Sequence, residues 1–234
     1  MHKMSSTVEI LGLSKPPIAI GFFESPPAGV HRWEGGSVAA GCMFWDKAMN
    51  GQTFYTIPSD HYNCAVGSYT HNIALPAERA HELNDTIAFM TENNYVATSE
   101  VPDIPTLAKS PGAVAYGPVD RAGFKPDVVL IAAKPAQAML IYEAAIKAGA
   151  GSALTNALGR PACAVLPLTM TNGQASISLG CKGSRTFTGL PDEEMYVAIP
   201  GGQWEAVIEK VTETHQASLA MEKYYSDRKT QIAR

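Results

Sequence analysis

The chain has 234 residues, of which 46% are hydrophobic and 17% are charged, and its formal net charge is -4. This balance is typical of a globular protein with a proper core, and the lack of a basic cluster argues against nucleic acid as a partner. The apolar runs are far shorter than the roughly 20 residues that a membrane span needs, and the N-terminal segment lacks the apolar core of a secretory signal. We therefore expect a cytoplasmic protein that does not enter membranes.

The first part of the chain alternates short apolar runs with turn-rich segments. The predicted elements are a short helix over 8–13, a buried strand over 18–23, a helix over 42–49, a strand over 53–57, a turn after Cys64 and a helix over 76–90. Asn50-Gly51 is a strong signal for a tight turn between the second helix and the second strand. In the last of these helices Leu83, Ile87 and Met90 fall on one face, which indicates an amphipathic helix.

The second part of the chain carries the strongest strand signals. The predicted elements are strands over 112–119, 127–133, 175–179 and 194–199, helices over 135–147 and from 203 to about 224, and a loop over 152–162. The run over 127–133 is almost continuously Val, Leu, Ile and Ala, as expected where both faces of a strand are covered. Pro135 stands at the first position of the following helix, where proline is favoured.

The two parts of the chain share a repeated unit, which indicates an internal duplication. One copy runs from Cys42 to Cys64 and the other from Cys163 to Cys181. Each copy consists of a cysteine, an apolar segment, the tripeptide Asn-Gly-Gln, a strand-like run and a second cysteine. A Lys-Pro segment stands upstream of each copy. Chance similarity between two strand–helix–turn–strand pieces is the alternative explanation.

These elements predict an α/β (or α+β) protein whose helices cover a mixed sheet. Because no linker separates the two copies, we expect a single compact domain over 8–224. It is built from two similar strand–helix–strand halves at about 14–75 and 112–200, and an exposed tail follows at 225–234.

The chain has only four cysteines, and they occupy matching places in the two halves. If Cys42, Cys64, Cys163 and Cys181 converge, four thiolates suit a zinc ion or an iron–sulfur cluster. The absence of Cys-x-x-Cys pairs weakens the zinc reading, and wide spacing with nearby glycines favours a [4Fe–4S] cluster. Backbone N–H groups at helix starts favour thiolate. A disulfide within each half and four inert core thiols are the alternatives.

The histidines near Cys64 are weaker candidates. His61 and His71 flank this cysteine, so a mixed Cys/His site could be built locally. Asp60 beside His61 could orient one of its ring nitrogens. A solvated or capping side chain is the usual role of a histidine in a polar loop.

Two further segments could contact a ligand. Lys182 and Arg185 lie in the glycine-containing stretch 180–186, which could bind an anion through its charges and backbone N–H groups; an ordinary surface turn is the alternative. Gln137 lies near a helix start at the predicted strand ends, where α/β proteins place ligands. Capping of its own helix is the other role open to Gln137.

Several segments around the four cysteines share a recognisable pattern. They are Gly117-Pro118, Pro135-Ala136-Gln137-Ala138-Met139, Leu179-Gly180-Cys181-Lys182-Gly183-Ser184-Arg185 and Asp192-Glu193-Glu194-Met195. With the cysteines, this pattern resembles the family known as domain of unknown function 169, over about residues 11–211. Members of that family are similar in placing cysteines at these four points, which implies a shared cysteine site. The family name assigns no activity.

We therefore expect an iron–sulfur protein for electron transfer or sensing, with the cluster held by the four cysteines. Two alternatives stay open: a small-molecule-binding protein or thiol-redox enzyme with its ligand at the strand ends near Arg185, and a scaffold stapled by zinc. The expected partner is a redox protein or a small molecule, and pseudo-symmetric folds of this kind often form homodimers. Whether the protein is an enzyme is left open.

Overall fold

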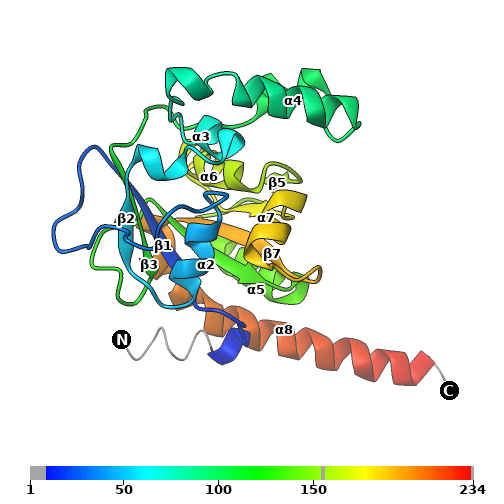
Figure 1. Cartoon of the computed structure of the whole chain (residues 1–234). Helices are drawn as coiled ribbons and strands as arrows, with labels where there is room; N and C mark the ends of the chain where they lie inside the picture. The colour runs from blue at the N-terminus through cyan, green and yellow to red at the C-terminus, as the bar shows by residue number, and fades with distance from the viewer. Residues whose placement is uncertain (1–8, 154–155, 233–234) are drawn as a thin grey trace.

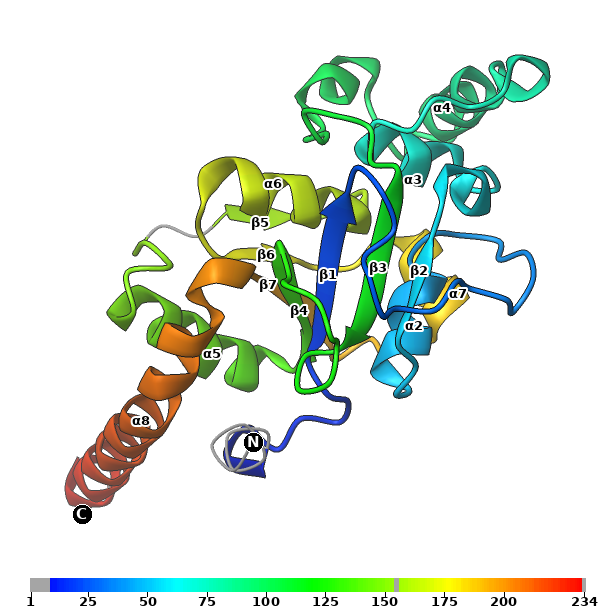
Figure 2. The ribbon, with the colours of Figure 1, turned by 90° about the vertical axis from the view of Figure 1, so that its left-hand side faces the viewer.

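The computed structural model describes residues 9–153 and 156–232, and a mixed sheet lies at its centre (Figures 1 and 2). Within these residues the sheet has seven strands in the order β2-β3-β1-β4-β7-β6-β5. The strands are β1 (Ile18–Phe23), β2 (Phe54–Thr56), β3 (Ala113–Pro118), β4 (Val128–Ala133), β5 (Asn156–Leu158), β6 (Ser176–Ser178) and β7 (Met195–Pro200). Neighbouring strands are antiparallel except β5 and β6, which are parallel. The predicted α/β class with a mixed sheet is confirmed.

Helices cover both faces of this sheet. The α-helices are α2 (Met43–Met49), α3 (Ala65–Thr70), α4 (Glu82–Glu92), α5 (Pro135–Lys147), α6 (Val165–Asn172), α7 (Lys182–Thr188) and α8 (Trp204–Ile232). Short 3-10 helices are η1 (Pro58–His61), η2 (Ala77–Arg79), η3 (Thr98–Asp103), η4 (Ala162–Ala164) and η5 (Gly201–Gln203). Figure 2 shows α2 and α7 on one side of the sheet and α5 and α8 on the other.

The central strand β4 divides the interior into two cores. Successive side chains of a strand point to opposite faces of the sheet. Val128, Leu130 and Ala132 therefore join the core beneath α2 and α6. Val129, Ile131 and Ala133 join the core beneath α5 and α8. All six side chains are buried, which explains the uninterrupted apolar run in the sequence.

The two halves of the chain place equivalent strands at equivalent positions. Outward from the centre, the order is β1, β3, β2 on one side and β4, β7, β6 on the other, and β1 pairs with β4. Strand β3 therefore belongs with the first half, although the predicted second half begins at residue 112. The registers also match. Ile18 pairs with Pro118 and Val128 pairs with Pro200, and both Ile18 and Val128 stand three residues after the lysine of the repeated Lys-Pro segment. The repeat in the sequence thus corresponds to two similar halves joined edge to edge.

The turn predicted after Cys64 and the surface turn considered after Cys181 are wrong, because both segments are helical. Helices α3 and α7 have 6 and 7 residues. Their glycines and serines favour turns locally, but tertiary packing stabilises short helices more than intrinsic propensity does. Strand β5 lies within the predicted loop over 152–162; three residues at a sheet edge leave almost no periodic signal.

Two predicted helices have different bounds. The helix predicted over 76–90 is divided into η2 and α4. The last helix continues to Ile232, past the predicted end near residue 224, and every residue from Leu219 to Ile232 is exposed. The predicted exposed tail is therefore a helical extension as far as the structure describes it. Residue 8, the predicted start of the domain, lies outside the described residues.

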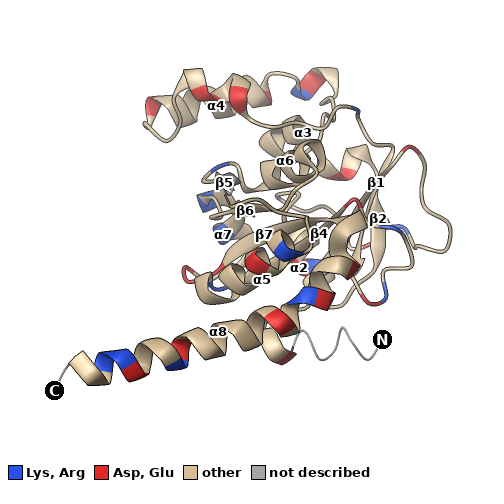
Figure 3. Cartoon of the chain, turned by 180° about the vertical axis from the view of Figure 1, so that it is seen from behind, with Lys and Arg blue, Asp and Glu red and all other residues tan. Residues whose placement is uncertain are grey.

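Charged residues are spread along α8, which projects from the body of the protein (Figure 3). This helix has 29 residues, long enough to cross a bilayer if it were apolar. Its charges rule this out. No helix in the described ranges combines the length and the apolar character of a membrane span.

Candidate functional site

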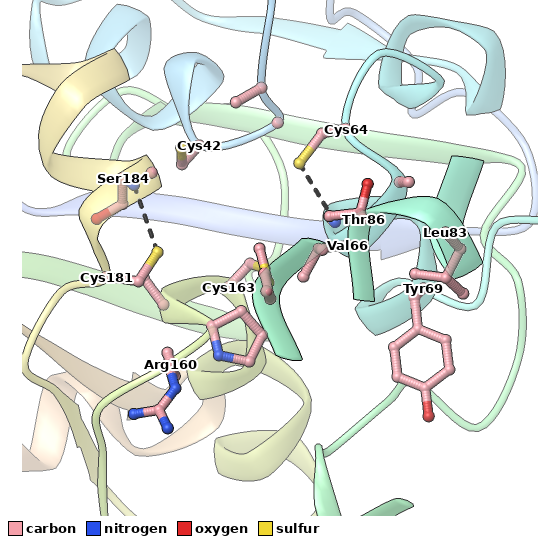
Figure 4. Close-up of a pocket in the computed structure, with 18 of the residues that line it drawn as sticks. Cys42, Cys64, Val66, Tyr69, Leu83, Thr86, Arg160, Cys163, Cys181 and Ser184 are labelled. Atoms are coloured by element: carbon pink, nitrogen blue, oxygen red, sulfur yellow. Dashed lines mark hydrogen bonds between the residues drawn. The ribbon is translucent and has the colours of Figure 1, made fainter. Parts of the chain in front are cut away.

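The fold brings all four cysteines to one pocket. Cys42, Cys64, Cys163 and Cys181 line it together, and Figure 4 shows their sulfur atoms around a common space. The thiols are close enough to interact electrostatically, because a charge on Cys181 raises the pKa of each of the other three. All four are half-buried and none forms a disulfide. The disulfide proposed within each half is thus absent from the structure.

Two of the cysteines start equivalent helices. The Cys64 Sγ accepts a hydrogen bond from the Gly67 backbone N–H at 3.3 Å, at the start of α3. The Cys181 Sγ accepts one from the Ser184 backbone N–H at 3.4 Å, at the start of α7. A side chain at position 67 would be crowded, since a Cβ there would lie 3.0 Å from the Cys64 Sγ. Both sulfurs are therefore oriented by the first turn of the helix that follows them.

The other two cysteines precede the equivalent helices α2 and α6. Cys42 stands directly before α2, and Cys163 lies in η4 two residues before α6. Both side chains pack against the core on this face of the sheet. The convergence of the four sulfurs thus follows from the matched topology: each half contributes one cysteine before a helix and one that caps the next helix.

Burial favours the protonated form of Cys42, Cys64 and Cys163, contrary to the prediction that helix N–H groups favour thiolate. Burial raises the pKa of Cys42 to about 12 and, together with the nearby Cys64, raises the pKa of Cys163 well above its usual value. Burial also raises the pKa of Cys64, and the Gly67 and Gly41 backbone N–H groups offset this only in part. Desolvation therefore outweighs the backbone hydrogen bonds.

The pocket extends well beyond the cysteines. Its volume is about 290 Å³, and its far wall is formed by the segment between α3 and β3. Leu83, Ile87 and Met90, predicted to share one face of their helix, all line this wall. Tyr95 and Arg160 also line the pocket, and no pattern in the sequence indicates either of them. Tyr95 belongs to the long connection between α3 and β3, and Arg160 to the segment between β5 and η4.

The two histidines beside Cys64 are both buried. His61 is 2% exposed, and its Nε2 lies 2.8 Å from the Thr56 hydroxyl. The carboxylate of Asp60 does not contact this ring; it accepts hydrogen bonds from Arg32 and from the Ile57 backbone N–H. The prediction that Asp60 orients His61 is therefore wrong. Burial lowers the pKa of His61 to about 4, so the ring is neutral at pH 7.

His71 differs from His61 in lining the cysteine pocket. Its side chain is 1% exposed, and neither ring nitrogen has a hydrogen-bond partner among the described residues. Burial lowers its pKa to about 3, with a further contribution from His61. His71 thus presents a neutral imidazole with an unused donor and an unused acceptor.

The remaining predicted contacts lie elsewhere or serve the fold. The Arg185 guanidinium donates hydrogen bonds to the backbone carbonyls of Leu179, Leu190, Pro191 and Glu194. Gln137 caps α5 at Lys134 and donates to the carbonyls of Leu11 and Gly12.

Lys182 is exposed, and its backbone N–H donates to the Tyr95 hydroxyl at 3.2 Å. Arg185, Gln137 and Lys182 are absent from the lining of the cysteine pocket. The surface turn considered for 180–186 is wrong, because most of this stretch is helix α7, and its binding of an anion stays a prediction. Its basic side chains therefore do not form a ligand site together with the cysteines.

Comparisons with known proteins agree with the resemblance found in the sequence. The model of the domain of unknown function 169 family, described as uncharacterised ArCR, matches residues 8–210. The chain is 26% identical over 127 residues to uncharacterized protein MJ0308 of Methanocaldococcus jannaschii. That match covers 53% of this chain and 54% of the relative, so the chain spans about half the length of that protein. No solved structure matches.

Proposed function

Because the chain belongs to the domain of unknown function 169 family, whose description assigns no activity, we propose its function from the pocket itself. Cys42, Cys64, Cys163 and Cys181 hold a [4Fe–4S] cluster that serves electron transfer or sensing. One observation carries this proposal: all the cysteines of the chain, two from each half, line the same pocket. When bound, such a cluster would supply one-electron transfer.

The spacing of the ligands supports a cluster over a single ion. In a zinc site each sulfur lies about 2.3 Å from the metal, so neighbouring sulfurs lie within about 4 Å of one another. In the described part of the chain no three His, Cys, Asp or Glu side chains are arranged to hold one ion. In a [4Fe–4S] cube each thiolate bonds a different iron, which suits four sulfurs around a wider space.

The surroundings of the sulfurs also suit a cluster. Backbone N–H groups donate to the Sγ atoms of Cys64 and Cys181, and hydrogen bonds to sulfur are among the factors that tune cluster potentials. Around them the pocket is mainly apolar. A cluster would hold the cysteines as thiolates, the form that burial disfavours for Cys42, Cys64 and Cys163 in the pocket without metal.

The proposal includes a reducing compartment and a redox partner. Four unlinked thiols in one pocket are stable where thiols stay reduced, as in a cytoplasm. A redox protein or a small molecule would exchange electrons with the cluster. A homodimer remains a prediction that no contact in the described chain addresses.

Elemental analysis of protein prepared without oxygen tests the cluster. We expect brown protein with about four iron atoms and four sulfides per chain and broad visible absorption that bleaches on reduction. Zinc at one per chain without sulfide would replace the proposal with the zinc scaffold. Colourless, metal-free protein from a host competent in cluster assembly, with rapidly alkylated cysteines, would instead favour thiol chemistry.

A further inference from the structure

The far end of the cysteine pocket has features that iron ligation does not use. We call it the α4 chamber: the part of the pocket lined by Leu83, Ile87 and Met90 of α4 and by Val101 and Ile104 from η3 and its end. His71 lies in the lining of the same pocket. In Figure 4, Leu83 and Tyr69 lie on the side of the pocket opposite Cys42 and Cys181. The cysteines therefore occupy one end of the cavity, and an apolar wall forms the other.

The wall formed by α4 packs on little of the protein. No side chain of α4 or η3 is buried. Leu83, Ile87 and Met90 remain half-buried although they face inward, because the chamber lies beneath them. Phe89, on the outer face of the same helix, is 66% exposed. An apolar molecule in the chamber would remove the inner face of α4 from water, which is favourable in proportion to the area covered.

His71 supplies a polar feature in the lining of the pocket that contains the chamber. Its side chain is 1% exposed and both ring nitrogens lack a hydrogen-bond partner among the described residues. Buried polar groups are nearly always hydrogen-bonded. A neutral imidazole can donate from one nitrogen and accept at the other, so a ligand with a carbonyl or hydroxyl group would satisfy it.

The charge in the chamber wall is already paired. Among the described lining residues Arg160 is the one cationic side chain. Its guanidinium lies 3.0 Å from the Glu100 carboxylate and 5.2 Å from the centre of the Tyr95 ring. These contacts tie the segment carrying α4 and η3 to the chain before Cys163. They leave no unpaired cation in the lining to recognise an acidic ligand.

From these features we propose that the α4 chamber binds a small, uncharged, largely apolar organic molecule whose carbonyl or hydroxyl group hydrogen-bonds to His71. The site goes beyond the proposed cluster and does not depend on it. The ligand would lie beside the four thiols, with α4 as its cover.

A fluorescence titration tests the chamber in the full chain as isolated anaerobically. The probe is 6-propionyl-2-(dimethylamino)naphthalene, which is uncharged and carries a carbonyl group. We expect saturable binding with a blue-shifted emission. Ile87→Trp should fill the chamber and weaken binding at least about tenfold. Phe89→Trp introduces the same indole on the outer face of α4 and should leave the affinity unchanged. Equal affinities of the two variants would overturn the proposed place of the site.

Competition against that probe tests His71. In wild type, 2-acetylnaphthalene should compete better than naphthalene, and His71→Leu should weaken 2-acetylnaphthalene about tenfold, the effect of one hydrogen bond. Naphthalene should compete as before, which also shows that the variant retains the chamber. An undiminished preference for the carbonyl compound would overturn the role of His71. Binding of anilinonaphthalene sulfonate that is tighter than binding of the uncharged probe would overturn the proposal that the ligand is uncharged.

Neither measurement depends on the iron content of the protein. A failure of the proposed ligand site can therefore be told apart from a failure of the proposed cluster.

Discussion

Helices α3 and α7 begin alike, each capped by a cysteine sulfur, but the chain continues differently after them. After α3 it passes through η2, α4 and η3 before entering β3. After α7 it reaches β7 through the short segment 189–194. The features common to both halves position the four sulfurs. The segment present in one half alone forms the wall of the α4 chamber. The repeat thus supplies a symmetric set of sulfur ligands. The segment inserted in the first half adds the wall of a chamber beside them.

The largest effect is expected from the cysteines that the halves share. Cys64→Ser and Cys181→Ser should each reduce cluster iron from about four per chain to a small remainder, because both sulfurs would be ligands. Iron and sulfide analysis of the two variants measures this. A serine hydroxyl still caps the helix, so the iron-free variants should unfold at nearly the same denaturant concentration as wild type. Full iron content in either variant would show that the two halves do not contribute equivalent cysteine ligands.

Large stability losses should be matched between the halves at Phe44 and Leu166. Each stands six residues before the asparagine of its Asn-Gly-Gln tripeptide, and each is 0% exposed. Phe44→Ala should cost about 3–5 kcal/mol and Leu166→Ala about 2–5 kcal/mol of unfolding free energy. Denaturant unfolding of iron-free protein measures both, with the half-exposed Met170→Ala as control. A loss below 1 kcal/mol at one of the two buried positions would show that the cores of the halves are not equivalent.

Acid should destabilise the first half specifically. His61 and His71 have pKa values lowered to about 4 and about 3 by burial, and residues 112–200 contain no histidine. Because the unfolded rings bind protons below about pH 6.5, stability is present above that pH and is lost as the pH falls toward 4. The slope is at most about 1.4 kcal/mol per pH unit for each ring.

Denaturant unfolding at a series of pH values checks this slope. His61→Gln should reduce the slope of unfolding free energy against pH by the contribution of one imidazole ring, since glutamine does not titrate. His81→Gln is the matched control, because the His81 side chain is 66% exposed. An unchanged slope in His61→Gln would contradict the assignment of the acid effect to the buried rings.

The smallest effect concerns the helix caps alone. In iron-free protein Cys64→Ala and Cys181→Ala should each cost about 0.5–1 kcal/mol, since a thiol sulfur is a weak acceptor for the capping N–H groups at 3.3 and 3.4 Å. Comparison with the serine variants separates helix capping from iron ligation. Serine should restore the stability that alanine loses, but it should not restore the iron content. A loss confined to one helix would show that only that cap contributes.

Much of the fold could be predicted because its strongest elements repeat a local pattern. The strands over 18–23 and 127–133 and the helix over 135–147 agree with β1, β4 and α5 to within a residue. Helices α3 and α7 could not be predicted, because each depends on a cysteine cap and on packing from the other parts of the fold. His71 stands beside Cys64 in the sequence analysis, yet its burial without a partner follows only from the segment that encloses it.

The sequence by itself determined the class of the fold, the duplication and the four positions from which sulfur could be presented. Periodicity and repeats express these directly, since they depend on neighbours along the chain. Only the tertiary structure decided that Cys42 and Cys64 meet Cys163 and Cys181, that Arg185 is held by backbone carbonyls, and that α4 covers a chamber beside the thiols. These outcomes depend on the central pairing of β1 with β4 and on the path of a long connection. Both join residues far apart in the chain, and no local pattern encodes such distances.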